Sequence, residues 1–163
     1  MAEAITQALL AAGGGKFLAV FLISMLPIIE LRGGLPAGVA MGMPLRTAFF
    51  AALLGNLLPV PFIILFIRRV FVWVRVHIPR LARFVDRLEA KAWSKSDKVV
   101  RYQTWGLLLF VAIPLPGTGA WTGALIAALL DLRLKNAVPA IALGVLIAGV
   151  IIAALTYGVT ALI

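Results

Sequence analysis

Ten consecutive residues, Pro27–Pro36, constrain the fold of this chain more than any other stretch, because they do not suit a lipid-facing helix. They include Glu30 and Arg32, two glycines and two prolines, and they lie between the apolar segments Phe17–Leu26 and Ala37–Met43. A charged side chain at bilayer depth is costly unless it is paired or faces water. Interrupted helices survive there only when buried in protein or when they line a wet cavity. We therefore interpret this segment as the tip of a re-entrant hairpin and as half of a functional site.

The composition places the chain among integral membrane proteins. Hydrophobic residues make up 63% of its 163 residues, which is too many for an ordinary soluble domain. The length predicts one membrane domain over residues 1–163, and the segment Met1–Gly15 lacks the basic start of a cleaved signal peptide. The chain has no cysteine and one histidine, and no catalytic triad, metal-ligand cluster or phosphate loop is present. We therefore expect no enzyme activity, no metal and no cofactor.

The positive charge is concentrated in one segment. Although the net charge is +9, ten of the fifteen Lys and Arg residues lie between Arg68 and Arg101, as the positive-inside rule predicts for a cytoplasmic loop. Such a concentration does not indicate nucleic-acid binding. We expect a cytoplasmic loop over residues 68–104, with Lys16 and Arg46 outside, in the cytoplasmic (inner) membrane of a prokaryote.

The first half of the chain predicts a hairpin followed by a span. A short helix is expected over residues 3–12. The apolar arm Phe17–Leu26 is too short to cross a bilayer, which takes about 20 residues. The tip Pro27–Pro36 and the returning arm Ala37–Met43 follow it. Residues Thr47–Ile67 are long enough to cross, with a kink expected at the prolines near the middle.

The segment Arg80–Ser96 has the periodicity of an amphipathic helix, with apolar residues on one face and basic residues largely outside it. Two interpretations remain open for it. The helix lies on a membrane surface, or it is a solvated connector that packs on its own protein.

The second half repeats the plan of the first. A short arm, Trp105–Ile113, leads into the Pro- and Gly-rich tip Pro114–Gly123, the arm Ala124–Leu130 and the uncharged span Asn136–Ile163. We expect an all-α membrane fold with two inverted repeats, 16–67 and 105–163, each a re-entrant hairpin plus a transmembrane helix. A basic cytoplasmic amphipathic helix within 68–104 joins them, and the two tips meet near the midplane. The alternative is four or six ordinary short spans with kinks.

The segments Glu30–Gly38 and Pro114–Gly123 resemble the signature pair of the putative small multidrug export family, and the resemblance covers essentially the whole chain. More distantly, the plan is similar to the DedA (VTT-domain) superfamily. Members of that superfamily have two opposed re-entrant hairpins and are implicated in moving lipids across bilayers. They typically carry an arginine on the second hairpin side, whereas the second tip here has no charge.

The candidate site residues cluster at the two tips. Glu30 is the expected proton-coupling residue, and Arg32 is expected to bind a phosphate or carboxylate with two parallel hydrogen bonds. The further candidates for substrate binding are small or polar residues: Gly33, Gly34, Asn56, Gly117, Thr118, Gly119 and Thr122. The glycines would present backbone N–H groups to an anion. Alternatively, Glu30 and Arg32 form a static ion pair and the glycines serve turn geometry alone. Asp131 is expected in an exposed ion pair with Arg133 or Lys135.

The leading functional hypothesis is a proton-coupled transporter or flippase that moves an amphipathic anion, such as a lipid phosphate, through the two hairpins. An uncoupled lipid scramblase and a non-transporting membrane scaffold are the alternatives. The expected partners are membrane lipids, the substrate and protons, and the sequence is compatible with a homo-oligomer.

Overall fold

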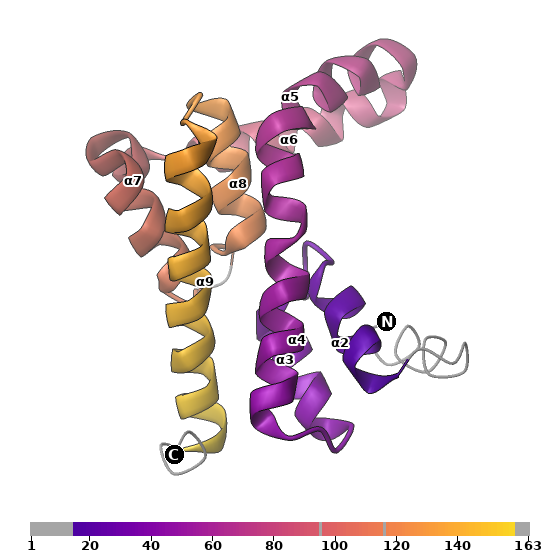
Figure 1. Ribbon diagram of the computed structural model, residues 1–163. Helices are drawn as coiled ribbons and strands as arrows, with labels where there is room; N and C mark the ends of the chain where they lie inside the picture. The colour runs from indigo at the N-terminus through magenta and orange to yellow at the C-terminus, as the bar shows by residue number, and fades with distance from the viewer. Residues whose placement is uncertain (1–14, 95, 116, 159–163) are drawn as a thin grey trace. The chain divides into compact units, whose positions relative to one another are not determined.

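The computed structural model describes residues 15–94, 96–115 and 117–158, and within these ranges the chain is helical with no β-strand (Figure 1). The helices are α2 (Lys16–Ser24), α3 (Glu30–Ala40), α4 (Leu45–Leu57), α5 (Pro59–His77), α6 (Pro79–Ser94), α7 (Asp97–Ala112), α8 (Ala120–Leu129) and α9 (Leu134–Tyr157). The predicted all-α class is therefore confirmed. The helix predicted over residues 3–12 lies outside the described residues.

The helices group into two compact units. One unit takes its described residues from Met1–Pro59 and Val145–Ile163, and the other is Val60–Gly144. The predicted division into two repeats and a connector stays a prediction.

Small residues bring the helices of the first unit together. Helices α2, α3 and α4 all pack against one another. A Cβ atom on Gly38 of α3 would lie 2.9 Å from the Val20 side chain of α2 and 2.8 Å from the Ala48 Cβ atom of α4. Glycine at this position therefore lets three backbones approach closely, as in packed membrane helices.

The second unit contains a helix pair and a charged hairpin. Helix α8 packs against α7 and α6, and a Cβ atom on Gly123 of α8 would lie 2.6 Å from the Val111 side chain of α7. Helices α5 and α6 are joined by ion pairs from Arg75 to Asp86 and Glu89. Both acids belong to α6, so these pairs connect α6 to Arg75 of α5.

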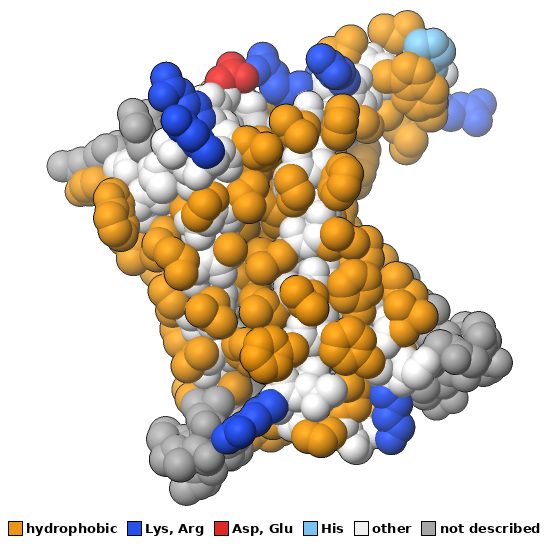
Figure 2. Space-filling view, in the orientation of Figure 1, with side chains coloured by type: hydrophobic (Ala, Val, Ile, Leu, Met, Phe, Trp, Pro, Cys, Tyr) orange, Lys and Arg blue, Asp and Glu red, His pale blue; other side chains and the backbone are white. Residues whose placement is uncertain are grey.

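Two helical segments are long and apolar enough to cross a membrane. They are Leu45–His77, which comprises α4 and α5, and Leu134–Tyr157, which is α9. Large apolar side chains remain exposed on them; the Phe62 side chain, for example, is 58% exposed. Figure 2 shows hydrophobic side chains over most of the visible surface, as a lipid-facing exterior requires.

The helix boundaries correct several expectations. The two predicted tips are shorter than expected, because α3 begins at Glu30 and α8 begins at Ala120. The described non-helical residues are therefore Met25–Ile29 in the first break, and 113–115 with 117–119 in the second. Helix α5 continues past Ile67, through the basic residues, to His77, and the interruption between α4 and α5 is the single residue Leu58. The predicted end of the first span at Ile67 stays a prediction, because a helix can continue beyond the membrane surface. The amphipathic helix and the last span agree with α6 and α9 to within a few residues at their described ends.

Candidate functional site

The first break in the helical chain sits between α2 and α3. Proline 27 has no N–H to continue α2, and the chain instead folds into short turns. The Met25 N–H donates to the Phe21 carbonyl at 3.2 Å, and the Glu30 N–H donates to the Leu26 carbonyl at 3.0 Å. Glu30 itself has a φ of +50°, which is uncommon for a residue other than glycine. The break is thus a turn held by backbone hydrogen bonds, in which the backbone dihedral angle of Glu30 departs from helical values.

Glu30 and Arg32 form a close but loose ion pair at the start of α3. The Arg32 Nε atom lies 4.0 Å from the Glu30 Oε2 atom, and the side chains are 24% and 7% exposed. Residues two apart on a regular helix point to different sides. The positive φ of Glu30 removes this restriction, so the turn itself brings the acid and the base together.

Gly33 and Gly34 serve close packing in this structure. The Gly33 N–H donates to the Ile29 carbonyl at 2.9 Å, so this N–H is engaged within the helical turn. A Cβ atom on Gly34 would overlap the Oγ atom of Ser24 in α2. Their predicted roles in substrate binding stay a prediction, and the packing role is what the structure shows.

Asn56 is buried near the end of α4, in the same unit as Glu30. Its side chain is 2% exposed, and its Oδ1 atom has no hydrogen-bond partner. Ala48 of α4 contacts Gly38 of α3, and these two helices follow each other across a short turn, so they run antiparallel. Asn56 follows Ala48 by two turns, and Glu30 precedes Gly38 by two turns. The register therefore places Asn56 and Glu30 at the same end of the helix pair.

Ser24 is a site residue that the sequence reasoning missed. It ends α2, is 0% exposed and has an Oγ atom without a partner. The only signal in the sequence is that Ser24 is the one polar residue in the apolar arm Phe17–Leu26. A single serine in an apolar helix gives no sign of whether its hydroxyl is buried. Only the packing of α3 against Ser24 reveals its burial.

The second break, in the other unit, is built around Thr118. Its hydroxyl oxygen lies 2.8 Å from the carbonyl oxygens of both Ile113 and Leu115, so its single hydrogen can be donated to either of them. Gly117 and Gly119 flank it with φ values of +78° and +129°, which favour glycine. Thr122 lies half-buried in the first turn of α8. The structure thus assigns Gly117, Thr118 and Gly119 a clear part in shaping the turn, whereas their predicted substrate contacts remain untested.

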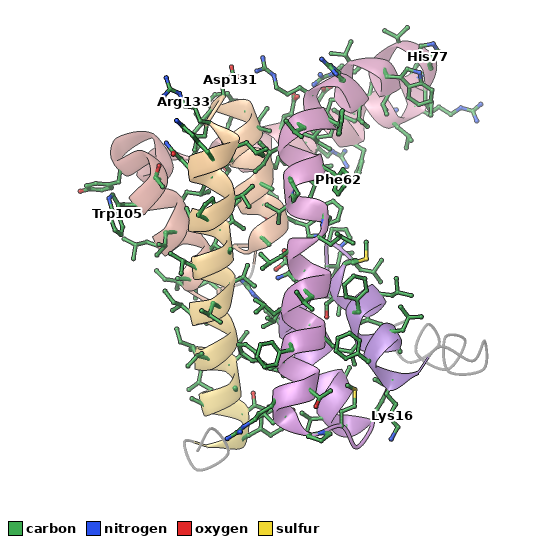
Figure 3. All side chains as sticks on the ribbon, viewed as in Figure 1. Lys16, Phe62, His77, Trp105, Asp131 and Arg133 are labelled. Atoms are coloured by element: carbon green, nitrogen blue, oxygen red, sulfur yellow. The ribbon has the colours of Figure 1, made fainter. Side chains whose placement is uncertain are left out.

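Charged residues away from the breaks form exposed pairs. Asp131 pairs with Arg68, not with the predicted Arg133 or Lys135, although Figure 3 shows Asp131 and Arg133 near each other at the turn between α8 and α9. His77 stacks on Trp73 with 4.9 Å between ring centroids. Within the described ranges no group of three His, Cys, Asp or Glu residues is placed to hold a metal ion.

Comparison with known proteins gives one match. The sequence model of the family described as "Putative small multi-drug export protein" matches residues 30–151, a range that begins at Glu30, directly after the first break, and includes the second. No curated protein and no solved structure matches the chain. The family match and the two apolar helical segments together indicate an integral membrane protein.

Proposed function

Because the chain belongs to the small multi-drug export family, and so to a family of transporters in general, we propose that it moves an amphipathic anion, such as a lipid phosphate, across the membrane together with a proton. The observation that carries the proposal is the buried Glu30 carboxylate beside Arg32 at a helix break in an apolar unit. Ionisable residues inside membranes are rare and usually mark transport pathways. Transport, rather than enzymatic catalysis, is the activity proposed.

Arg32 would receive the anion. It lies in the first turn of α3, where the helix dipole favours negative charge. Its guanidinium group matches the geometry of a phosphate or carboxylate, and its Nε atom is 4.0 Å from the Glu30 Oε2 atom. An arriving anion would compete with Glu30 for Arg32, and the released Glu30 carboxylate would take up the co-transported proton.

Helix lengths support re-entrant hairpins. Helices α2, α3 and α8 have 9, 11 and 10 residues. At about 1.5 Å per residue they are about 14–17 Å long, against a hydrocarbon core of about 30 Å. We propose that each hairpin enters and leaves the membrane on one side, with α2–α3 opening to the outside and α7–α8 to the cytoplasm, so that the two halves are inverted and the breaks face one another. This is the arrangement of the DedA superfamily that the sequence resembles.

The membrane orientation follows from charge. The basic segment between Arg68 and Arg101 would lie in the cytoplasm of a prokaryotic cell, with the protein in its inner membrane. Within the described residues of α6 the acids Asp86 and Glu89 both pair with Arg75 of α5, so the bases of α6, such as Arg83 and Arg87, have no remaining acid on that helix to neutralise them. Those bases would face anionic headgroups.

The test is reconstitution of the full chain in liposomes that carry an NBD-labelled phosphatidic acid, followed by dithionite quenching. We expect an imposed pH gradient to shift the label between leaflets, and Glu30→Gln to abolish the shift. Asp131→Asn, which removes an exposed carboxylate, is the control and should behave as wild type. Equal two-way movement without a gradient would identify a scramblase instead. No movement in any condition would favour a scaffold that works through residues 68–104.

A further inference from the structure

Two buried oxygen atoms in the first unit lack hydrogen-bond partners. They are the Ser24 Oγ atom, in a residue 0% exposed, and the Asn56 Oδ1 atom, in a residue 2% exposed. A buried polar atom without a partner is unfavourable, and proteins seldom keep one without a reason. Here two such atoms lie in a single packed group of three helices, one at the end of α2 and the other near the end of α4.

A third oxygen group, the Glu30 carboxylate, lies at the same end of this group of helices. Gly34 and Gly38 are spaced four residues apart and are both buried, so they form one face of α3, and the buried residue Glu30 begins the helix one turn before Gly34. Gly34 on that face abuts the Ser24 Oγ atom, which places Ser24 one turn from Glu30. Ala48, Ala52 and Asn56 form the corresponding buried face of α4. The antiparallel register described above then brings Asn56 to the level of Glu30.

We propose that the Ser24 hydroxyl, the Asn56 side-chain carbonyl and the Glu30 carboxylate form a binding site for a monovalent cation, Na⁺. All three groups offer oxygen lone pairs, which hard cations require. One carboxylate is too little negative charge for a typical Ca²⁺ or Mg²⁺ site. Ser24 is the last residue of α2, and the C-terminal ends of interrupted helices favour cations.

The charge of Arg32 determines when the cation binds. With Arg32 4.0 Å from the carboxylate, Glu30 is already partly neutralised and a cation gains little there. An anion bound to Arg32 would offset the guanidinium charge and leave Glu30 available to Na⁺. The coupling step therefore rests on the proposed transport of an anion, whereas the existence of the cation site does not. In this scheme Na⁺ and the proton compete for the same carboxylate.

The experiment measures binding of ²²Na⁺ to the purified full chain at pH 8, with choline replacing Na⁺ to hold ionic strength constant. We expect weak, saturable binding to wild type and binding about tenfold tighter in Arg32→Gln, because the competing cation is gone. Ser24→Ala and Asn56→Leu should each weaken binding about tenfold. Ser94→Ala, which alters an exposed serine, should leave it unchanged.

Thermal unfolding provides a second measurement that does not depend on radiolabel binding. Na⁺ should raise the midpoint of wild type and, by a larger margin, of Arg32→Gln, whereas choline should not. If neither protein binds Na⁺ or is stabilised by it, the site is refuted, even if the labelled lipid still moves with a pH gradient. If Ser24→Ala and Asn56→Leu change stability equally in Na⁺ and choline, the two oxygens hold a water molecule only, and the proposal is again overturned. Na⁺ binding without any lipid movement would instead retain the site and remove the proposed transport.

Discussion

Gly34 of α3 lies directly against Ser24 of α2, so that a Cβ atom on Gly34 would overlap the Ser24 Oγ atom and stand 3.1 Å from the Ser24 Cβ atom. This contact joins the two arms on either side of the first break. It also explains how a helix can carry Gly33-Gly34 at a packed position, since the missing side chain leaves room for a neighbouring hydroxyl. The break is therefore held by close packing as well as by its own turn hydrogen bonds.

Gly34→Ala should destabilise the protein by about 1–3 kcal/mol, because the added methyl group overpacks the contact. Ser24→Ala in the same chain should restore part of the loss, since it removes the overlapping oxygen but leaves the 3.1 Å approach to the Cβ atom. Unfolding in mixed detergent micelles measures both variants. If the double variant is no more stable than Gly34→Ala alone, the Ser24 hydroxyl is not what limits this position.

Gly55→Ala should be the more damaging glycine substitution. A Cβ atom there would overlap the backbone carbonyl of Phe21 in α2, and a backbone cannot rotate away as a hydroxyl can. The cost should be about 3 kcal/mol, offset by up to about 1 kcal/mol from the better helix propensity of alanine. Gly15→Ala is the matched control, since nothing lies within 4 Å of the added atom. Similar stabilities for the two variants would argue against the α2–α4 packing.

The sequence was informative about the breaks and less so about their extent. The Pro- and Gly-rich segments correctly located two interruptions, because proline 27 and the Gly117–Gly119 turn have local chemistry that overrides helix formation. The inclusion of Arg32 through Pro36 in a helix was not predicted. Two glycines and a proline in close succession predict a break in a helix. Here they are part of α3, whose Gly34 packs against Ser24 and whose Gly38 packs against Ala48, and this tertiary packing overrides the low helix propensity.

The candidate site was predicted in part for the same reason. Charges in an apolar chain are conspicuous, so Glu30 and Arg32 could be found from the sequence, and the structure brings them within 4.0 Å. Burial of a hydroxyl or an amide depends on what packs over it. Asn56 was identified from its place in an apolar span, whereas Ser24 was not, because its burial depends on a neighbouring helix that no local pattern reveals.

The orientation can be measured with single cysteines, since the chain has none of its own. Ser94→Cys in α6 should resist an impermeant maleimide in sealed cells and react once the inner membrane is opened. Lys16→Cys, at an exposed position, should react in sealed cells. Labelling of Ser94→Cys in intact cells, with Lys16→Cys protected, would reverse the proposed topology.

Arg32→Lys tests whether charge alone suffices at the start of α3. Lysine keeps the positive charge but loses the planar fork that matches a phosphate, so transport of the labelled lipid should fall while stability changes little. Arg32→Ala should lose transport and its response to a pH gradient together. This variant removes the guanidinium that lies 4.0 Å from the Glu30 carboxylate, so the buried acid loses its nearby cation. If Arg32→Lys transports the labelled lipid as fast as wild type does, Arg32 does not bind the anion through two parallel hydrogen bonds.

The decisive variant removes both charges of the first break. If Glu30 and Arg32 form only a structural ion pair, Glu30→Gln with Arg32→Gln should be stable and active, because two opposite buried charges have been removed together. If they act on the proton and the anion, the double variant should fold and still fail to transport. Expression and thermal unfolding establish folding, and the labelled-lipid assay establishes activity, with Asp131→Asn again as the control for loss of an exposed carboxylate. An active double variant would refute the assignment of Glu30 and Arg32, yet it would leave the helix breaks and their packing intact, since neither depends on these charges.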